Sequence, residues 1–265
     1  MTHTQVIAHR GACAHAPENT LAAFRRAAAL GSSAIETDLR VTREGRFVLL
    51  HDARVNRTTN GRGRIADLPF GAVRRLDAGS WFAAEFAGER VPTLEETLAL
   101  AAELDLGIYL ELKTSLEGAL PFALAEALRR LPRPPRIVLL AFDARALVRM
   151  RSVRPRLETG LLVGRADPMI EKARRMGSGL LAGRTGPKIE VARRAGARLL
   201  APRARRVSAR LVERAHEAGL GVVAWTVNEP KEMRRLLALG VEGLMTDWPD
   251  RLIETIGQTA SYDRR

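Results

Sequence analysis

Pairs of ionisable residues stand at the ends of short apolar runs in the first half of the chain. They are His9 and Arg10, Glu36 and Asp38, His51 and Asp52, and Glu111 and Lys113. A strand buried in a parallel sheet normally excludes charge. In a β/α barrel, by contrast, polar side chains at the carboxyl ends of the strands face the functional site. The repeated pattern therefore indicates one site to which several strands contribute.

Three of these residues, Glu36, Asp38 and Glu111, are predicted to bind a divalent cation. Glu36 and Asp38 are two positions apart, so an extended strand points both side chains to the same face. Carboxylates that converge in a buried barrel end repel one another and take up protons unless a cation neutralises them. An all-oxygen ligand set selects Mg²⁺ or Ca²⁺ over Zn²⁺. A single carboxylate would be explained equally well by a salt bridge, and only the set of three favours a metal.

Two histidines and two cations complete the predicted site. Imidazole exchanges protons near neutral pH, so His9 and His51 suit a general base and a general acid. Either histidine alone would more simply be a hydrogen-bonded core residue. Arg10 can bind a phosphate through two parallel hydrogen bonds, and Lys113 adds a point charge. The combination predicts cleavage of a phosphodiester, with charge stabilised on its nonbridging oxygens.

The elements that must position these residues alternate between strand and helix. Short runs rich in Val, Ile and Leu are separated by segments of helical period, which is typical of β/α units around a parallel sheet. The predicted strands cover residues 6–9, 34–39, 46–51, 107–112, 137–142, 159–163, 198–202, 221–227 and 243–247. Predicted helices run from the cap Asn19 to about Leu30, from Thr93 through LEETLALAAEL, from Ser208 to Ala218 and from Glu229 to Leu239.

These elements predict one (β/α)8 TIM barrel, a single domain over residues 1–265. Nine strands are one too many, and we expect either 159–163 or 198–202 to be peripheral. Residues 40–45 are too few for the helix of a parallel crossover, so the barrel should be irregular between its second and third strands. Residues 52–92 are rich in turns and should form an insertion that covers the active-site end.

Composition restricts the class of protein. With 46% hydrophobic and 28% charged residues, the chain is of ordinary globular type. The net charge of +13 comes almost wholly from arginines scattered over helical segments without interleaved aromatics, so we expect no dedicated nucleic-acid binding. The single cysteine excludes an intramolecular disulfide. No signal peptide or membrane span is visible, which predicts a cytoplasmic protein without stable membrane insertion. The oligomeric state stays open.

The order of short motifs resembles the glycerophosphodiester phosphodiesterase family. The matching motifs are HRG with PENT (9–11, 17–20), ETD (36–38), HD (51–52), RTTNGRG (57–63), LDAGSWF (76–82), VPTLEE (91–96), ELK (111–113), WTVN (225–228) and GVEGLMTDWP (240–249). The resemblance spans nearly the whole chain and weakens over residues 143–207. It implies a barrel enzyme that hydrolyses deacylated phospholipids, such as glycerophosphocholine or glycerophosphoethanolamine, to glycerol 3-phosphate and an alcohol.

The resemblance also implies roles for individual residues. The implied roles are metal ligation by Glu36, Asp38 and Glu111, acid and base catalysis by His9 and His51, and phosphate binding by Arg10 and Lys113. It adds Trp225 as an apolar wall beside the substrate. It leaves open the headgroup, the choice of metal, which histidine is the acid, and whether water or the glycerol 2-hydroxyl attacks.

Two other readings are compatible with the same barrel. A lysophospholipase D or a phosphoinositide-type phosphodiesterase should approach membranes, and the sequence has no amphipathic helix with a strong apolar face and basic flanks. A noncatalytic barrel that binds phosphate or nucleic acid would use the basic surface. The complete set of strand-end residues argues against that second reading.

Overall fold

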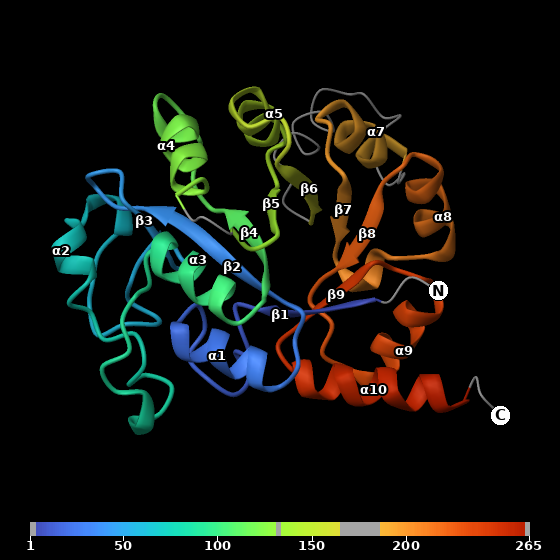
Figure 1. Ribbon diagram of the computed structural model, residues 1–265, viewed down its shortest axis with the longest axis horizontal. Helices are drawn as coiled ribbons and strands as arrows, with labels where there is room; N and C mark the ends of the chain where they lie inside the picture. The colour runs from blue at the N-terminus through green and yellow to red at the C-terminus, as the bar shows by residue number, and fades with distance from the viewer. Residues whose placement is uncertain (1–3, 131–133, 165–185, 263–265) are drawn as a thin grey trace.

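Eight parallel strands close into a barrel, with helices around the outside (Figure 1). The computed structural model describes residues 4–130, 134–164 and 186–262. The barrel strands are β1 (Gln5–His9), β2 (Ala34–Val41), β4 (Gly107–Leu112), β5 (Ile137–Ala141), β6 (Glu158–Val163), β7 (Leu199–Pro202), β8 (Gly221–Ala224) and β9 (Gly243–Thr246). Neighbours run in the order β1-β9-β8-β7-β6-β5-β4-β2, and pairing of β1 with β2 closes the ring. The predicted (β/α)8 fold is confirmed.

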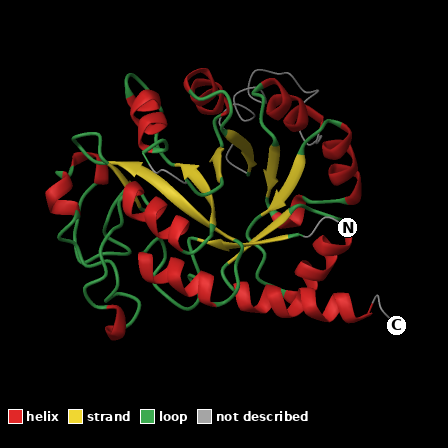
Figure 2. Cartoon of the chain, in the orientation of Figure 1, coloured by secondary structure: helices red, strands yellow, loops and turns green. Residues whose placement is uncertain are grey.

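Helices follow the barrel strands and pack against their outer faces (Figure 2). They are α1 (Leu21–Ala29), α3 (Leu94–Glu103), α4 (Leu120–Ala127), α5 (Ala144–Val153), α7 (Gly186–Arg194), α8 (Ala209–Glu217), α9 (Pro230–Ala238) and α10 (Pro249–Tyr262). The predicted cap of α3 is confirmed, because Thr93 and Glu96 form a reciprocal capping box. Among the described residues, no helix is both long and apolar enough to cross a membrane.

The predicted cap of α1 is off by one residue. Thr20, and not Asn19, accepts the hydrogen bond from the backbone N–H of Ala23 at the start of the helix. Asn19 instead has a left-handed backbone, with φ of 58°, and is buried. Its side chain points to β2, where it serves the site described below. Both residue types are good caps, so the local sequence did not distinguish them.

Side chains on each barrel strand alternate between the barrel interior and the helices. Ile7, Tyr109, Leu162 and Met245 belong to the cluster that fills the interior. Their chain neighbours face outward into the larger cluster that the strands form with the helices, as Ile108 does. A residue two positions after an interior apolar residue therefore faces the interior as well. This alternation decides which polar residues meet at the barrel mouth. The mouth is the end of the barrel formed by the carboxyl ends of its strands.

The ninth strand, β3 (Phe47–Leu49), lies outside the barrel and pairs antiparallel with β2. The prediction that residues 159–163 or 198–202 were peripheral is therefore wrong, because both segments are barrel strands. The predicted irregularity after β2 is confirmed. The chain reverses within a tight turn, in which Gly45 adopts φ of 81° and the N–H of Thr42 donates to the carbonyl of Arg46. Such a turn joins antiparallel strands only.

Residues 52–92 form a group of turns and short helices beside β2 and β3, at the left of Figure 1. The short helices are η1 (Ile65–Asp67), α2 (Phe70–Val73) and η2 (Ala84–Phe86). This group has a small core of its own, to which Val55, Ile65 and Val91 contribute. Val48 and Leu50 from the hairpin complete that core. The insertion thus packs on β3 rather than on the barrel interior.

Candidate active site

Three buried carboxylates from two adjacent strands converge at the barrel mouth. Glu36 and Asp38 follow Ala34 on the interior face of β2, and Glu111 follows Tyr109 on that of β4. The strand register places Asp38 directly beside Glu111. One carboxylate oxygen from each of the three lies within 4.8 Å of the others. The sequence prediction placed Glu36 and Asp38 at the end of a strand, but the hairpin with β3 prolongs β2 to Val41.

Burial and mutual repulsion shape the ionisation of this cluster. Burial and the charge of Asp38 raise the pKa of Glu36 to about 8. The same two causes raise the pKa of Glu111. Burial also raises the pKa of Asp38, but Lys113 and Arg10 outweigh it and hold that pKa below its ordinary value. A buried group of oxygen ligands that cannot all ionise in isolation fits a hard divalent cation such as Mg²⁺ or Ca²⁺.

Two cations border the carboxylates, as the sequence predicts. Nζ of Lys113 lies 3.2 Å from Oδ1 of Asp38 and 2.6 Å from Oε1 of Glu111. Nε of Arg10 lies 3.4 Å from Oδ2 of Asp38, is buried, and donates no hydrogen bond within the described residues. The backbone N–H of Arg10 donates to Glu36, and the residue adopts φ of 57°. The next residue, Gly11, has to be glycine, because a Cβ there would lie 2.7 Å from the Cβ of Ala23.

His9 ends β1 beside the carboxylate cluster, with Nε2 3.9 Å from Oε2 of Glu36. Its Nδ1 lies 2.6 Å from Oδ1 of Asp247, which follows β9. The amide of Asn228 donates to the other oxygen of Asp247, and the Cys13 thiol donates to Oδ1. Burial lowers the pKa of His9, but the bond to Asp247 and the charge of Glu36 outweigh it and leave that pKa raised. A carboxylate on one ring nitrogen fixes the tautomer and orientation of an imidazole.

His51 reaches the site by a different route from the predicted one. It follows β3, which is not a barrel strand, and the antiparallel pairing returns the chain to the level of Asp38, whose carbonyl accepts from the N–H of Leu50. The guanidinium of Arg40 donates to the carbonyls of His51 and Lys113 and holds the two segments together. Nδ1 of His51 lies 2.7 Å from Oδ1 of Asp52. Burial lowers the pKa of His51, and the charges of Arg10 and Lys113 lower it further. The charge of Asp38 acts in the opposite direction but does not outweigh them.

Trp225 lies on the other side of the mouth, after β8, with β9 and β1 between it and β2. Its indole N–H donates to the carbonyl of Ala201 at 2.7 Å. Its ring meets that of Phe142 edge to face, with centroids 5.8 Å apart. The guanidinium carbon of Arg203 lies 4.9 Å from the indole centroid. These three contacts fix the position of Trp225 at the mouth.

A comparison with protein families matches residues 9–251 to the glycerophosphoryl diester phosphodiesterase family. The chain belongs to this family. The enzyme class implied by the motifs is thereby confirmed. A glycerophosphodiester phosphodiesterase of Caldanaerobacter subterraneus is 34% identical over 257 residues, which cover 96% of this chain and 98% of the relative.

Solved structures of glycerophosphodiester phosphodiesterases and related enzymes share the fold. A phosphodiesterase of Oleispira antarctica, solved in complex with the product sn-glycerol-3-phosphate, is 28% identical, with a TM-score of 0.82 and 96% of each chain covered. A glycerophosphodiester phosphodiesterase of Agrobacterium tumefaciens is 25% identical, with a TM-score of 0.76 and coverage of 94% of this chain and 99% of that one.

The site of this phosphodiesterase family member includes two residues, Asp247 and Asn19, that the sequence prediction did not place in it. Asp247 lies two positions after the interior residue Met245, so the alternation alone would have pointed it at the mouth. Asn19 donates to Oδ2 of Asp38 at 2.9 Å and accepts from its backbone N–H. No period or spacing signalled Asn19, because its contact depends on the turn before α1.

A further contact that the sequence did not predict joins the insertion to the candidate active site. Arg57 donates to Oδ2 of Asp52 at 2.7 Å and to both oxygens of Glu18. Glu18 in turn accepts from the guanidinium of Arg10 at 2.9 Å. Arg57 thus connects the partner of His51 to the partner of Arg10. The contact joins segments distant in sequence, so the motif RTTNGRG by itself did not reveal it.

Proposed function

We propose that this protein hydrolyses glycerophosphodiesters, such as glycerophosphocholine and glycerophosphoethanolamine, to sn-glycerol 3-phosphate and an alcohol. One observation carries the proposal: two imidazoles, each paired with its own carboxylate, flank three buried carboxylates and two cations. The product found in the Oleispira antarctica phosphodiesterase supports the same substrate class for this chain.

Arg10 and Lys113 would hold the phosphate of the substrate. Both cations stand against Asp38, and Nε of Arg10 donates no hydrogen bond among the described residues. A guanidinium matches two phosphate oxygens, and an ammonium adds charge at a third position. Together they would stabilise the negative charge that builds on the nonbridging oxygens during displacement.

Glu36, Asp38 and Glu111 would bind one Mg²⁺ or Ca²⁺ through carboxylate oxygens. When bound, the cation supplies Lewis-acid stabilisation of the phosphoryl oxygens. Loss of the proton on Glu36 would accompany its binding, since the pKa of that carboxyl is about 8.

His9 and His51 would transfer the protons. One imidazole takes a proton from the attacking oxygen, and the other gives one to the departing alkoxide, so no net proton is consumed at that step. Asp247 and Asp52 hold Nδ1 of the two rings, and neither Nε2 makes a hydrogen bond among the described residues, so the Nε2 atoms would carry out this exchange. The attacking oxygen is proposed to be the glycerol 2-hydroxyl, since a tethered nucleophile gains effective concentration. Water would then open the cyclic phosphate.

Residues 52–92 would form one wall of the substrate site. A pocket of about 400 Å³ lies where the insertion begins, lined by Arg40, His51, Asp52, Ala53, Arg54 and Lys113. It contains one proposed catalytic residue and one proposed phosphate ligand. The contacts of Arg57 with Asp52 and Glu18 support the same view, because they join the insertion to the site.

The deciding experiment measures release of glycerol 3-phosphate from a panel of glycerophosphodiesters, with a chelator and after adding Mg²⁺ or Ca²⁺. We expect release that stops with the chelator and returns with the cation. Glu111→Gln should weaken the metal titration at least tenfold, whereas Glu103→Gln, at an exposed carboxylate of α3, should titrate like the parent. Faster cleavage of lysophosphatidylcholine than of glycerophosphocholine would instead assign a lysophospholipase D activity, and full activity without metal would reject the metal assignment.

A further inference from the structure

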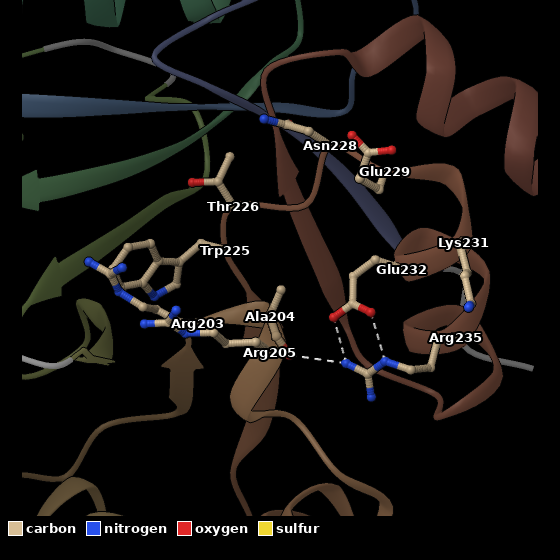
Figure 3. Close-up of a pocket in the computed structure, with 10 residues that line it drawn as sticks. All are labelled: Arg203, Ala204, Arg205, Trp225, Thr226, Asn228, Glu229, Lys231, Glu232 and Arg235. Atoms are coloured by element: carbon tan, nitrogen blue, oxygen red, sulfur yellow. Dashed lines mark hydrogen bonds and ion pairs between the residues drawn. The ribbon is translucent and has the colours of Figure 1, made fainter.

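A pocket of about 790 Å³ opens beside Trp225, between the segments that follow β7 and β8 (Figure 3). Its lining comprises Arg203, Ala204, Arg205, Trp225, Thr226, Asn228, Glu229, Lys231, Glu232 and Arg235. Four of these residues are cationic and two are carboxylates, so the pocket is positively charged. Neither the proposed metal ligands nor the proposed catalytic histidines line it.

The cations of this pocket differ in whether their side-chain N–H groups have acceptors within the protein. Arg235 pairs with Glu232 at 2.7 Å and donates to backbone carbonyls, so its charge is used within the fold. Arg203 has no carboxylate partner among the residues that the structure describes, and its buried Nε donates no hydrogen bond there. An unsatisfied buried N–H is costly in a folded protein. Among the lining residues, Arg203 is therefore the one with a buried side-chain N–H that has no acceptor in the described part of the chain.

Trp225 holds Arg203 in place. The guanidinium lies against the indole (Figure 3). The two residues also form a parallel backbone bridge. Arg203 follows the interior residue Ala201 by two positions, so it starts from the interior face of the barrel. A guanidinium stacked on an aromatic ring is restrained in its plane and still presents its N–H edge to a ligand.

The pocket adjoins the proposed phosphate site through an aromatic pair. Phe142 packs against Trp225, and it also lines a second pocket of about 330 Å³ together with Glu111 and Lys113. On its other side, Asn228 lines the first pocket and donates to Asp247, the partner of His9. A diester whose phosphate lies at Lys113 can thus extend one arm past the aromatic pair toward Arg203.

We propose that Arg203, stacked on Trp225, forms a subsite for an anionic group, a carboxylate or a phosphate, on the alcohol portion of the substrate. The inference rests on the proposed glycerophosphodiesterase activity. An uncharged glycerol arm leaves the guanidinium unsatisfied, and a choline or ethanolamine group meets like charge. A carboxylate or phosphate accepts two parallel N–H bonds from it. The subsite therefore favours alcohols that carry an anion over those that carry only a cation.

Two matched substrate pairs test this subsite. Glycerophosphoserine differs from glycerophosphoethanolamine by one carboxylate, and glycerophosphoinositol 4-phosphate differs from glycerophosphoinositol by one phosphate. The parent enzyme should prefer the anionic member of at least one pair, by about tenfold in kcat/KM. The pair that shows the preference identifies the anion as carboxylate or phosphate.

Arg203→Gln should bring that preference close to one. The control is Arg206→Gln, which removes the same charge from the same turn, η3 (Ala204–Arg206), at an exposed residue outside the pocket lining, and should keep the preference. Arg203→Lys retains the charge but not the planar fork, and we expect an intermediate preference; it serves as well if the glutamine variant does not fold.

Three outcomes would overturn the subsite. Equal rates for both members of both pairs in the parent enzyme would do so without any variant. A preference that persists in Arg203→Gln would assign the recognition elsewhere. Equal losses on all substrates in that variant would place Arg203 on the scissile phosphate instead. Hydrolysis of glycerophosphoethanolamine in any of these cases leaves the proposed function intact, whereas no glycerol 3-phosphate from any substrate would reject that function and the subsite with it.

Discussion

Nδ1 of His9 lies 2.6 Å from Oδ1 of Asp247, although 238 positions separate the two residues in the chain. Closure of the barrel brings them together, because β9 pairs with β1 in parallel register. Asp247 is held from a second side by Asn228. The carboxylate therefore has a defined position from which to orient the imidazole.

Asp247→Asn should lower kcat by about 10²-fold while the protein stays folded, because the imidazole loses the carboxylate that fixes its tautomer. Steady-state kinetics and a thermal melt check this. Asp250→Asn is the matched control, since Asp250 pairs with His15 at 3.1 Å outside the proposed set of catalytic residues. Similar losses in both variants would mean that Asp247 acts only through stability.

Metal binding should stabilise the protein more at high pH than at low pH. Burial and Asp38 raise the pKa of Glu36 from 4.5 to about 8. The folded metal-free protein thus favours the protonated acid, and this stability is present below pH 4.5 and is lost as the pH rises through 8. A cation at about 100 times its Kd should raise Tm by about 5 to 10 °C.

Thermal melts with and without Mg²⁺ or Ca²⁺, at about pH 6 and about pH 8.5, measure this difference. The gain in Tm should be larger at the higher pH, where no proton has to be displaced from Glu36. In Glu36→Gln the pH dependence of the metal-free Tm should flatten. Equal gains at both pH values in the parent protein would contradict the linkage.

Replacing either proposed catalytic histidine should lower kcat by about 10²- to 10⁴-fold and leave KM within a few-fold, because Arg10 and Lys113 remain to hold the phosphate. The variants are His9→Ala and His51→Ala, with kcat and KM measured on glycerophosphocholine. His216→Ala, at a histidine of α8 that pairs with Glu242, should behave like the parent. Unaltered turnover in both active-site variants would reject acid and base catalysis by these rings.

A substrate without the glycerol 2-hydroxyl should be cleaved more slowly by about 10²-fold or more, because the tethered nucleophile is lost. Glycerophosphocholine and its 2-deoxy analogue provide the comparison, with choline release as the common readout. A transient cyclic glycerophosphate, detected by phosphorus NMR, should appear with the first substrate alone. Equal rates for the two would instead assign the attack to water.

The insertion is predicted to be dispensable for the barrel core and necessary for substrate use. The N–H of Leu49 donates to the carbonyl of Pro92, so the ends of the insertion lie close together and a short Gly/Ser linker can replace residues 53–91. Exposure of Val48 and Leu50 should lower Tm but keep one cooperative transition, since their cluster is separate from the barrel core. Failure to obtain folded protein would contradict this.

A single substitution tests the same segment without removing it. Arg57→Gln should lower kcat/KM about tenfold by releasing Asp52 and Glu18, whereas Arg62→Gln, at an exposed residue of the insertion, should leave it unchanged. Equal effects of the two variants would reduce the role of Arg57 to general surface charge.

Short-range patterns in the sequence determined the barrel and most of its site. The alternation of apolar runs and helical segments predicted the parallel strands, since periodicity and turn residues are local properties. The two-residue spacing of Glu36 and Asp38 placed both on one face, because side chains alternate along any strand. The same alternation also places Asp247 on the interior face, once the strand to which it belongs is recognised.

Only the tertiary structure decided that β3 lies outside the barrel and how His51 reaches the site. The sequence ranked residues 159–163 and 198–202 as the weakest strands, yet closure of the ring requires both, and β3 turns back along β2. Strand propensity does not specify the partner or direction of pairing, which depend on contacts across the whole barrel. For the same reason His51 reaches Asp38 through an antiparallel hairpin, and Arg57 joins Glu18 to Asp52 only once the insertion has packed against β3.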